Sequence, residues 1–405
     1  MRRPRLEVAA IVRQQGAACL ARSGPTLSGA QQRALRALAL CRTAALGGHS
    51  TQCDHGGHEA QASNSGRHRR CPTCHGAAPA TWLAAREREV LATPYVPVSF
   101  TLPHALGPLA LQHPRPLSGF LCRTVAQTLQ DIAGDPKHLG AEIGGFAGLH
   151  TWGQPLHHHP HLHGVLPAGG LAPDGTQWLP CRPHVFWPVR VLSRRFRRLS
   201  LAGLEHLYGQ GHLTVTGRWR ERAEPPPWRH LLAALRDQEW GGDATEPRQA
   251  PRPVLQSLAR STHRVAISNH RRVSLEDGQV TCRSKDSHRG HRLRPLTLEA
   301  VECLRRLMLH GPPHGFHRLR HVGFLANRVR PAKLAQCRTF LGHATPPHTR
   351  GQAVDLDLQP PEGAAGEPGT PCPVCQPGRM QRITTVYRQP GVWDLAVPTP
   401  GLDTS

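Results

Sequence analysis

Cysteine and histidine are concentrated between residues 41 and 75, where the sequence reads CRTAALGGHSTQCDHGGHEAQASNSGRHRRCPTCH. CPTC at 71–74 is a Cys-x-x-Cys knuckle, which presents two thiolates to one tetrahedral zinc ion. A structural zinc ion contributes folding free energy, so we predict an N-terminal zinc-binding domain over residues 1–90. The alternative is a polar loop with incidental thiols. The candidate ligands are Cys41, His49, Cys53, His55, His58, Cys71, Cys74 and His75.

A second concentration of histidine lies at 157–163, HHHPHLH, before a turn rich in proline and glycine. Imidazole is the most common metal ligand in proteins. HLHGVLP at 161–167 has the pattern of a short strand, so His161 and His163 leave one face while Leu162 points to the other. Two imidazoles on one strand face indicate a metal site. The alternative is that the histidines lie in a loop and bind no metal.

The patterns along the rest of the chain predict an α+β fold, with strands mixed with segregated helices. TLEAVECLRRLML at 297–309 has the pattern of a helix with Thr297 as its N-cap. Asp277-Gly278 indicates the turn of a hairpin over 274–281. Further elements are expected as helices at 81–94 and 117–133 and a strand at 95–106.

Proline and glycine dominate from about residue 346 onward. Such a composition buries too little apolar surface to fold, so we expect a largely disordered C-terminal tail over 346–405. CPVC at 372–375 is a second knuckle, and on its own it would supply half of a zinc site.

Charge points to a polyanionic partner. The 405 residues include 50 Lys and Arg and 27 Asp and Glu, which gives a formal net charge of +23. DNA is the first candidate partner for such a field, and a biased codon composition is the alternative. We find no apolar run of the roughly 18 residues that a membrane span needs, and no adequate apolar segment for a signal peptide. We therefore expect a cytoplasmic protein, associated with the nucleoid through DNA, whose twelve cysteines serve metal binding rather than disulfides.

Five stretches between about residues 40 and 342 stand in the order of one known family. They are CRTAALGGH with CPTCHGAA, FTLPHAL, LHTWGQPLHHHPHLHGVLPAGGLAPDG, RSTHRVAISNHRRVSLEDGQVT, and RHVGFLANRVRPAKLAQCR. Together they resemble the insertion-sequence transposases of the two-tyrosine HUH type, which move DNA by a rolling-circle-like route. The resemblance implies a zinc-binding domain, then an HUH-type nuclease domain with an antiparallel sheet over residues 91–345. It also implies single-stranded ends of the element as the DNA partner.

The resemblance implies a role for the second histidine cluster. HUH enzymes bind a divalent ion, usually magnesium or manganese, through two histidines that flank an apolar residue, here His161 and His163. The ion would polarise the scissile phosphate. A third ligand is usual, and His150 and Gln154 are the two candidates. The histidines at 157–159 are expected to be neighbours rather than ligands.

The nucleophiles of the family are two tyrosines four residues apart, on one helix face. They are expected just before THRVAISNH, where this chain has Ser257 and Ser261. A serine hydroxyl is shorter than a phenol and has a far higher pKa, so it needs an activating base. The three tyrosines of the chain have no partner at this spacing. We therefore expect the two catalytic positions, and with them strand cleavage, to be impaired.

Other positions also depart from the family pattern. Three usual zinc-ligand positions and four usual aromatic positions are occupied by other residues: Gly56, Gly66 and Arg70, and Cys282, Ser284, Ser287 and Val322, respectively. These losses indicate a diverged or degenerate copy. With Gly56 and Gly66 in place of ligands, we expect Cys41, His49, Cys53, Cys71 and Cys74 to hold at most one zinc ion.

Two hypotheses follow for the function. The chain is either a transposase that cleaves and joins single strands through a phosphotyrosine, or a DNA-binding protein that has lost cleavage, such as a pseudogene product. The serine pair discriminates between them. A metal-dependent hydrolase unrelated to DNA is disfavoured by the charge and by the order of the motifs. The oligomeric state is not predicted.

Overall fold

The computed structural model describes most of the chain between residues 6 and 386. The described residues are 6–66, 68, 70–72, 74, 78–153, 156–181, 187–214, 225–247, 253, 255–256, 267, 271–286, 292–311, 315–342, 369–375 and 377–386.

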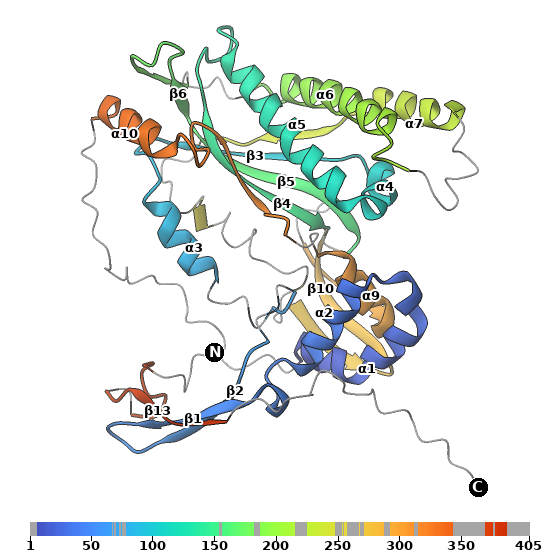
Figure 1. Ribbon diagram of the computed structural model, residues 1–405, viewed down its shortest axis with the longest axis vertical. Helices are drawn as coiled ribbons and strands as arrows, with labels where there is room; N and C mark the ends of the chain where they lie inside the picture. The colour runs from blue at the N-terminus through green and yellow to red at the C-terminus, as the bar shows by residue number, and fades with distance from the viewer. Residues whose placement is uncertain are drawn as a thin grey trace.

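A five-stranded antiparallel sheet lies at the centre of the molecule, with the strand order β12-β4-β5-β3-β8 (Figure 1). Its strands are β3 (Tyr95–Thr101), β4 (Gly144–Trp152), β5 (His158–Pro167), β8 (Gly241–Ala244) and β12 (Leu319–Gly323). Alternate residues along a strand face opposite sides, so each strand supplies two different surfaces. Leu149 and Leu162 are paired across β4 and β5 and point to one side, whereas Phe146 and Val165 are paired and point to the other.

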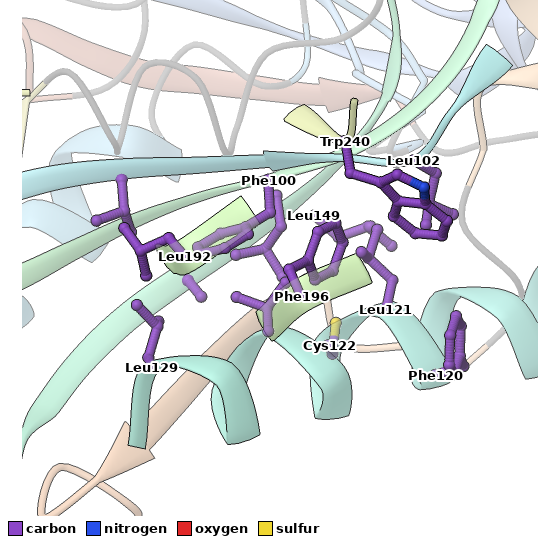
Figure 2. Packing of buried hydrophobic residues seen from close by; sticks show 14 of the residues in the cluster. Phe100, Leu102, Phe120, Leu121, Cys122, Leu129, Leu149, Leu192, Phe196 and Trp240 are labelled. Atoms are coloured by element: carbon purple, nitrogen blue, oxygen red, sulfur yellow. The ribbon is translucent and has the colours of Figure 1, made fainter. Parts of the chain in front are cut away.

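Helices cover the leucine side of this sheet and form the largest core. They are α4 (Gly107–Gln112), α5 (Pro114–Gly134), α6 (Val189–Gly209) and α7 (Pro225–Asp237), with the short 3-10 helix His104–Leu106 before them. Figure 2 shows Phe196 of α6 beside Phe100 of β3 and near Trp240. The Phe196 ring lies edge-on to both, with centroid distances of 5.1 Å to Phe100 and 5.5 Å to Trp240. Such edge-to-face contacts add to the hydrophobic stabilisation of the core.

The opposite side of the sheet carries a smaller core. Phe146, Val165 and Tyr95 pack there with Leu255 and with Leu334 of α10. The elements on this side of the molecule are α3 (Ala78–Glu87), α10 (Arg330–Phe340) and the hairpin of β6 (Gly169–Leu171) and β7 (Trp178–Pro180). This side also carries the histidines described below.

A second unit combines the N-terminal helices with a segment between residues 271 and 309 (Figure 1). Three helices, α1 (Val8–Ser23), α2 (Gly29–Leu40) and α9 (Ala300–Leu309), pack with a sheet of order β11-β10-β9. The strands are β9 (Arg272–Glu276), β10 (Gln279–Asp286) and β11 (Arg292–Glu299), and a 3-10 helix at Gly24–Thr26 links the first two helices. Residues on both sides of the predicted boundary at residue 90 therefore share one core.

The third unit is a sheet of order β13-β1-β2, which contains β1 (Gly48–Cys53), β2 (Glu59–Ser63) and β13 (Met380–Val386). The 3-10 helix Ala44–Leu46 precedes it. β13 belongs to the region predicted as a tail, and it pairs antiparallel with β1 over Cys53↔Met380 to Gly48↔Val386. Residues 369–375 and 377–386 of that region are thus part of this third unit, together with β1 and β2 from the N-terminal region.

The expected α+β fold is confirmed, and the local predictions need three corrections. The helix predicted at 297–309 begins at Ala300 with Glu299 as N-cap, and Thr297 lies in β11 opposite Thr281. The helix expected at 81–94 spans Ala78–Glu87, and the strand expected at 95–106 ends at Thr101. The Asp277-Gly278 turn is confirmed, because both residues have positive φ, 48° and 72°, as a type I′ hairpin turn requires.

Candidate metal centres

Three histidines meet on the Phe146 side of the central sheet. The register places His150 of β4 opposite His161 of β5, and Gly148 opposite His163, so all three side chains leave the same face. Their ring centroids lie 4.9 to 5.1 Å apart. One ring nitrogen from each lies within 4.8 Å of the others, which is the spacing at which a single ion can be held.

The environment keeps the imidazoles of His161 and His163 neutral, as a metal ligand must be. Burial lowers the pKa of His161 to about 4, and burial also lowers the pKa of His163. His150 is only 4 % exposed. The Nδ1 atom of His161 lies 2.7 Å from the carbonyl oxygen of His159, so Nδ1 donates its proton there and Nε2 presents its lone pair.

The structure thus brings together His161 and His163, which the sequence singled out, and His150, one of its two candidates for the third ligand. Gln154, the other candidate, lies outside the described residues. The histidines at 157–159 do not join the set within the described chain. Burial lowers the pKa of both His158 and His159 to about 4.

Sequence reasoning missed two features beside this set. The Trp152 ring stacks on His150 with a centroid distance of 5.0 Å and an interplanar angle of 16°. The guanidinium carbon of Arg318 lies 5.9 Å from the Trp152 ring centroid, within the range of a cation–π contact. An aromatic face and a cation therefore lie next to the histidines. Arg318 directly precedes β12, the strand that pairs with β4, and no local sequence pattern marks this arrangement.

The connection between β4 and β5 is held by a buried histidine, His310 at the end of α9. Its Nδ1 atom lies 3.1 Å from the carbonyl oxygen of Thr151, and its Nε2 atom lies 2.9 Å from that of Leu156. Burial lowers the pKa of His310 to about 4. This side chain ties the second unit to the strands that carry the histidine set.

The two serines at the family's tyrosine positions, Ser257 and Ser261, lie outside the described residues. Leu255, two residues before the first, is fully buried in the cluster of Phe146 and Val165, on the histidine side of the sheet. The described tyrosines are engaged elsewhere. Tyr95 is buried and its hydroxyl accepts a hydrogen bond from the Leu91 amide, while Tyr208 stacks on Trp228 at 4.2 Å.

Two further sets of candidate metal ligands consist of cysteines. The Cys41 sulfur lies 3.6 Å from that of Cys71 and 3.2 Å from that of Cys74. The neighbouring thiols raise the pKa of Cys71, because adjacent thiolates repel each other unless a cation neutralises them. This donor set fits zinc. His49 joins neither cysteine set within the described chain, and His75 is not among the described residues.

The second cysteine set departs from the sequence interpretation. Cys53 was grouped with the N-terminal ligands, but it lies with Cys372 and Cys375 from the CPVC knuckle. Its sulfur is 3.4 Å from the sulfur of Cys375. The region that was expected to be a tail therefore completes a cluster that begins in the N-terminal domain.

The arginine-rich stretch at 194–199 forms part of α6, on the leucine side of the sheet. Arg195 is paired with Asp131, and Phe196 is buried in the core. Arg190, Arg194 and Arg197 line a cavity of about 540 Å³ with Val189, Ser193, Glu239 and Trp240. Part of the stretch is therefore available to anions, on the side of the sheet opposite to the histidines.

Comparison with known proteins identifies the family. A family model described as "putative transposase" matches residues 144–333, which begin at β4 and include all three histidines. A model described as "transposase zinc-binding domain" matches residues 11–102. A protein of Sinorhizobium fredii named "putative transposase y4qJ" is 48% identical over 393 residues, which are 96% of this chain and 98% of that protein. The chain belongs to this transposase family.

A second relative is the transposase for insertion sequence element IS801 of Pseudomonas savastanoi pv. phaseolicola. It is 30% identical over 287 residues, which are 69% of this chain and 65% of that protein. No solved structure matches the chain. The family carries a zinc-binding domain, and the cysteine clusters of this member fit structural zinc. No helix within the described parts of this transposase homologue is long and apolar enough to span a membrane.

Proposed function

We propose that this transposase homologue binds single-stranded DNA beside a divalent ion held by His150, His161 and His163, and that its strand cleavage is impaired. The observation that carries the proposal is the convergence of three imidazoles on one face of the sheet, two of which burial keeps neutral. An ion bound there would polarise a phosphate and stabilise the charge that develops on it. Of the two ions that the resemblance implies, manganese suits this set better, because magnesium prefers oxygen ligands.

Trp152 and Arg318 supply a surface for the nucleic acid. Any base can stack on an exposed aromatic face, so such binding does not depend on the DNA sequence. An arginine contributes both stacking and attraction to phosphate. Both side chains are half-buried, Trp152 stacks on His150, and Arg318 lies beside the Trp152 ring. A nucleotide that stacks there has its phosphate close to the histidine set. The formal net charge of +23 adds attraction of lower specificity and would keep the protein on nucleoid DNA.

The nucleophile is the weak component. The family forms a phosphotyrosine intermediate, whereas this chain has Ser257 and Ser261 at the corresponding positions. Leu255, two residues before Ser257, is buried in the Phe146 cluster on the histidine side of the sheet. Neither Tyr95 nor Tyr208 can replace the missing phenols, since one is buried in a core and the other is stacked on α7.

The proposal is tested with single-stranded oligonucleotides that carry the ends of the element, with and without Mn²⁺. We expect binding that weakens steeply as salt rises, because phosphate contacts release counterions. We also expect Mn²⁺ binding that His161→Ala removes, and no covalent protein–DNA adduct. DNA binding that barely changes with salt, or Mn²⁺ binding that survives His161→Ala, would contradict the proposal. An adduct that Ser257→Ala abolishes would show instead that serine is a working nucleophile.

A further inference from the structure

Two short turns face each other where the C-terminal strand meets the N-terminal domain. One is Cys53 to Gly56, which begins at the last residue of β1, and the other is Cys372 to Cys375, before β13. In the first turn the Gly56 amide donates to the Cys53 sulfur at 3.3 Å, and in the second the Val374 amide donates to the Cys372 sulfur at 3.4 Å. Amide donors of this kind stabilise sulfur in its thiolate form, which is the form that binds metal.

The sheet that contains these turns has almost no hydrophobic core. Its buried cluster consists of Cys53, Cys372 and Met380, with Ala60 and Cys375 partly buried against it. Met380 is the buried residue of β13, and the residues that follow it in the strand are exposed. A three-stranded sheet needs a packed apolar face to be stable, and small units without one depend on a metal or on disulfides. Backbone pairing alone therefore does not account for the position of β13.

The fourth corner of the cluster is occupied by a glycine. A Cβ atom at Gly56 would lie 3.5 Å from the Cys375 sulfur, so a cysteine side chain there would point into the cluster. Within the described residues no histidine or carboxylate joins the three sulfurs. Two Cys-x-x-Cys turns facing each other would form a four-thiolate zinc site, and this chain has three of the four thiolates.

We propose that Cys53, Cys372 and Cys375 bind one zinc ion, which fastens the C-terminal strand to the N-terminal domain and lacks a fourth thiolate because residue 56 is glycine. This site is separate from the Cys41, Cys71 and Cys74 set. It lies outside the range matched by the zinc-binding family model, since two of its ligands come from residues 372 and 375. Its role is to hold β13 in place, and this role does not depend on whether the protein cleaves DNA.

The zinc content of the purified full chain tests the site. Cys372→Ser with Cys375→Ser should lower the content by one equivalent, and Cys71→Ser with Cys74→Ser should remove a different equivalent. Cys181→Ser is the matched control, because Cys181 is half-buried, free and in neither set. Hydrogen exchange of the β13 amides should accelerate in the first variant and in wild type stripped of zinc, and it should slow again when zinc is restored.

A gain of ligand provides the second arm of the test. Gly56→Cys should slow zinc release to a chelator about tenfold or more, with unchanged stoichiometry, because it supplies the fourth thiolate. The proposal is overturned if Cys372→Ser with Cys375→Ser retains the wild-type zinc content. It is equally overturned if mass spectrometry finds a Cys53–Cys375 disulfide in protein that holds no zinc at these residues. An unchanged release rate in Gly56→Cys would refute the assignment of the fourth corner.

Discussion

Acid should destabilise this protein in a defined pH window, because its buried histidines are held neutral. The pKa values of His158 and His161 are about 4 in the folded chain, against about 6.5 in an unfolded one. The unfolded state therefore takes up protons first as the pH falls. The stability that these side chains contribute is complete above pH 6.5 and is lost progressively down to pH 4.

The magnitude follows from the difference between the two pKa values. At pH 5.5, one unit below the unfolded pKa, each histidine costs about 1.4 kcal/mol of unfolding free energy, so the pair costs about 3 kcal/mol. This is an upper value because both side chains retain some contact with solvent. The free energy of unfolding of a whole domain is about 5–15 kcal/mol, so the loss is a substantial fraction of it.

Urea unfolding at pH 7.5 and pH 5.5 measures the total loss, to which His159 and His310 also contribute. The buffer is free of Mn²⁺ and Mg²⁺ and contains no chelator, so that zinc bound at the cysteine sites would be retained. His158→Gln should reduce the difference in unfolding free energy between the two pH values by about 1.4 kcal/mol. His206→Gln, at an exposed position on α6, is the control and should leave the difference unchanged. The reasoning is wrong if wild type is equally stable at both pH values, or if both variants follow wild type.

Three further predictions concern the proposed function and the fold. Ser257→Tyr with Ser261→Tyr should restore metal-dependent cleavage with covalent capture of the 5′ side of the DNA, seen as a labelled adduct on a denaturing gel. His161→Ala should abolish this adduct. A double variant that binds Mn²⁺ and DNA yet does not cleave would place the defect elsewhere. Phe196→Ala should lower the unfolding free energy by about 3–5 kcal/mol in urea titrations, because this buried ring contacts two other aromatic rings; a loss below 1 kcal/mol would contradict the packing described. Trp152→Ala should weaken binding of single-stranded oligonucleotides by about 1–3 kcal/mol in anisotropy titrations while Mn²⁺ affinity is retained, and equal binding by both proteins would exclude the stacking role.

The sequence predicted those parts of the histidine site that depend on local periodicity. His161 and His163 are two residues apart on a strand, so their common face follows from the pleat alone. The position of His150 beside these two could not be derived in the same way. It depends on the register that places His150 opposite His161, and that register is set by long-range pairing of β4 with β5.

The cysteine ligands show where such reasoning reaches its limit. Cys71 and Cys74 are recognisable as a knuckle, but the partner of Cys53 lies more than three hundred residues away in sequence. Composition alone indicated that the region around Cys375 would not fold, and composition does not reveal a contact between cysteines that are distant in sequence. Thr297 is a similar case at smaller scale. Threonine is a favourable N-cap residue, but Thr297 pairs within the sheet instead, where its hydroxyl lies 3.0 Å from that of Thr281.

The pairing of β13 with β1 has a consequence for synthesis of the protein. Cys53 and Cys375 are 322 residues apart, so a ribosome that adds about 5–20 residues per second needs roughly 16–64 s to deliver the second sulfur after the first. Throughout this interval the nascent N-terminal sheet lacks its third strand. A chain that is terminated before residue 372 never obtains that strand. The N-terminal sheet can therefore be completed only after translation has passed β13.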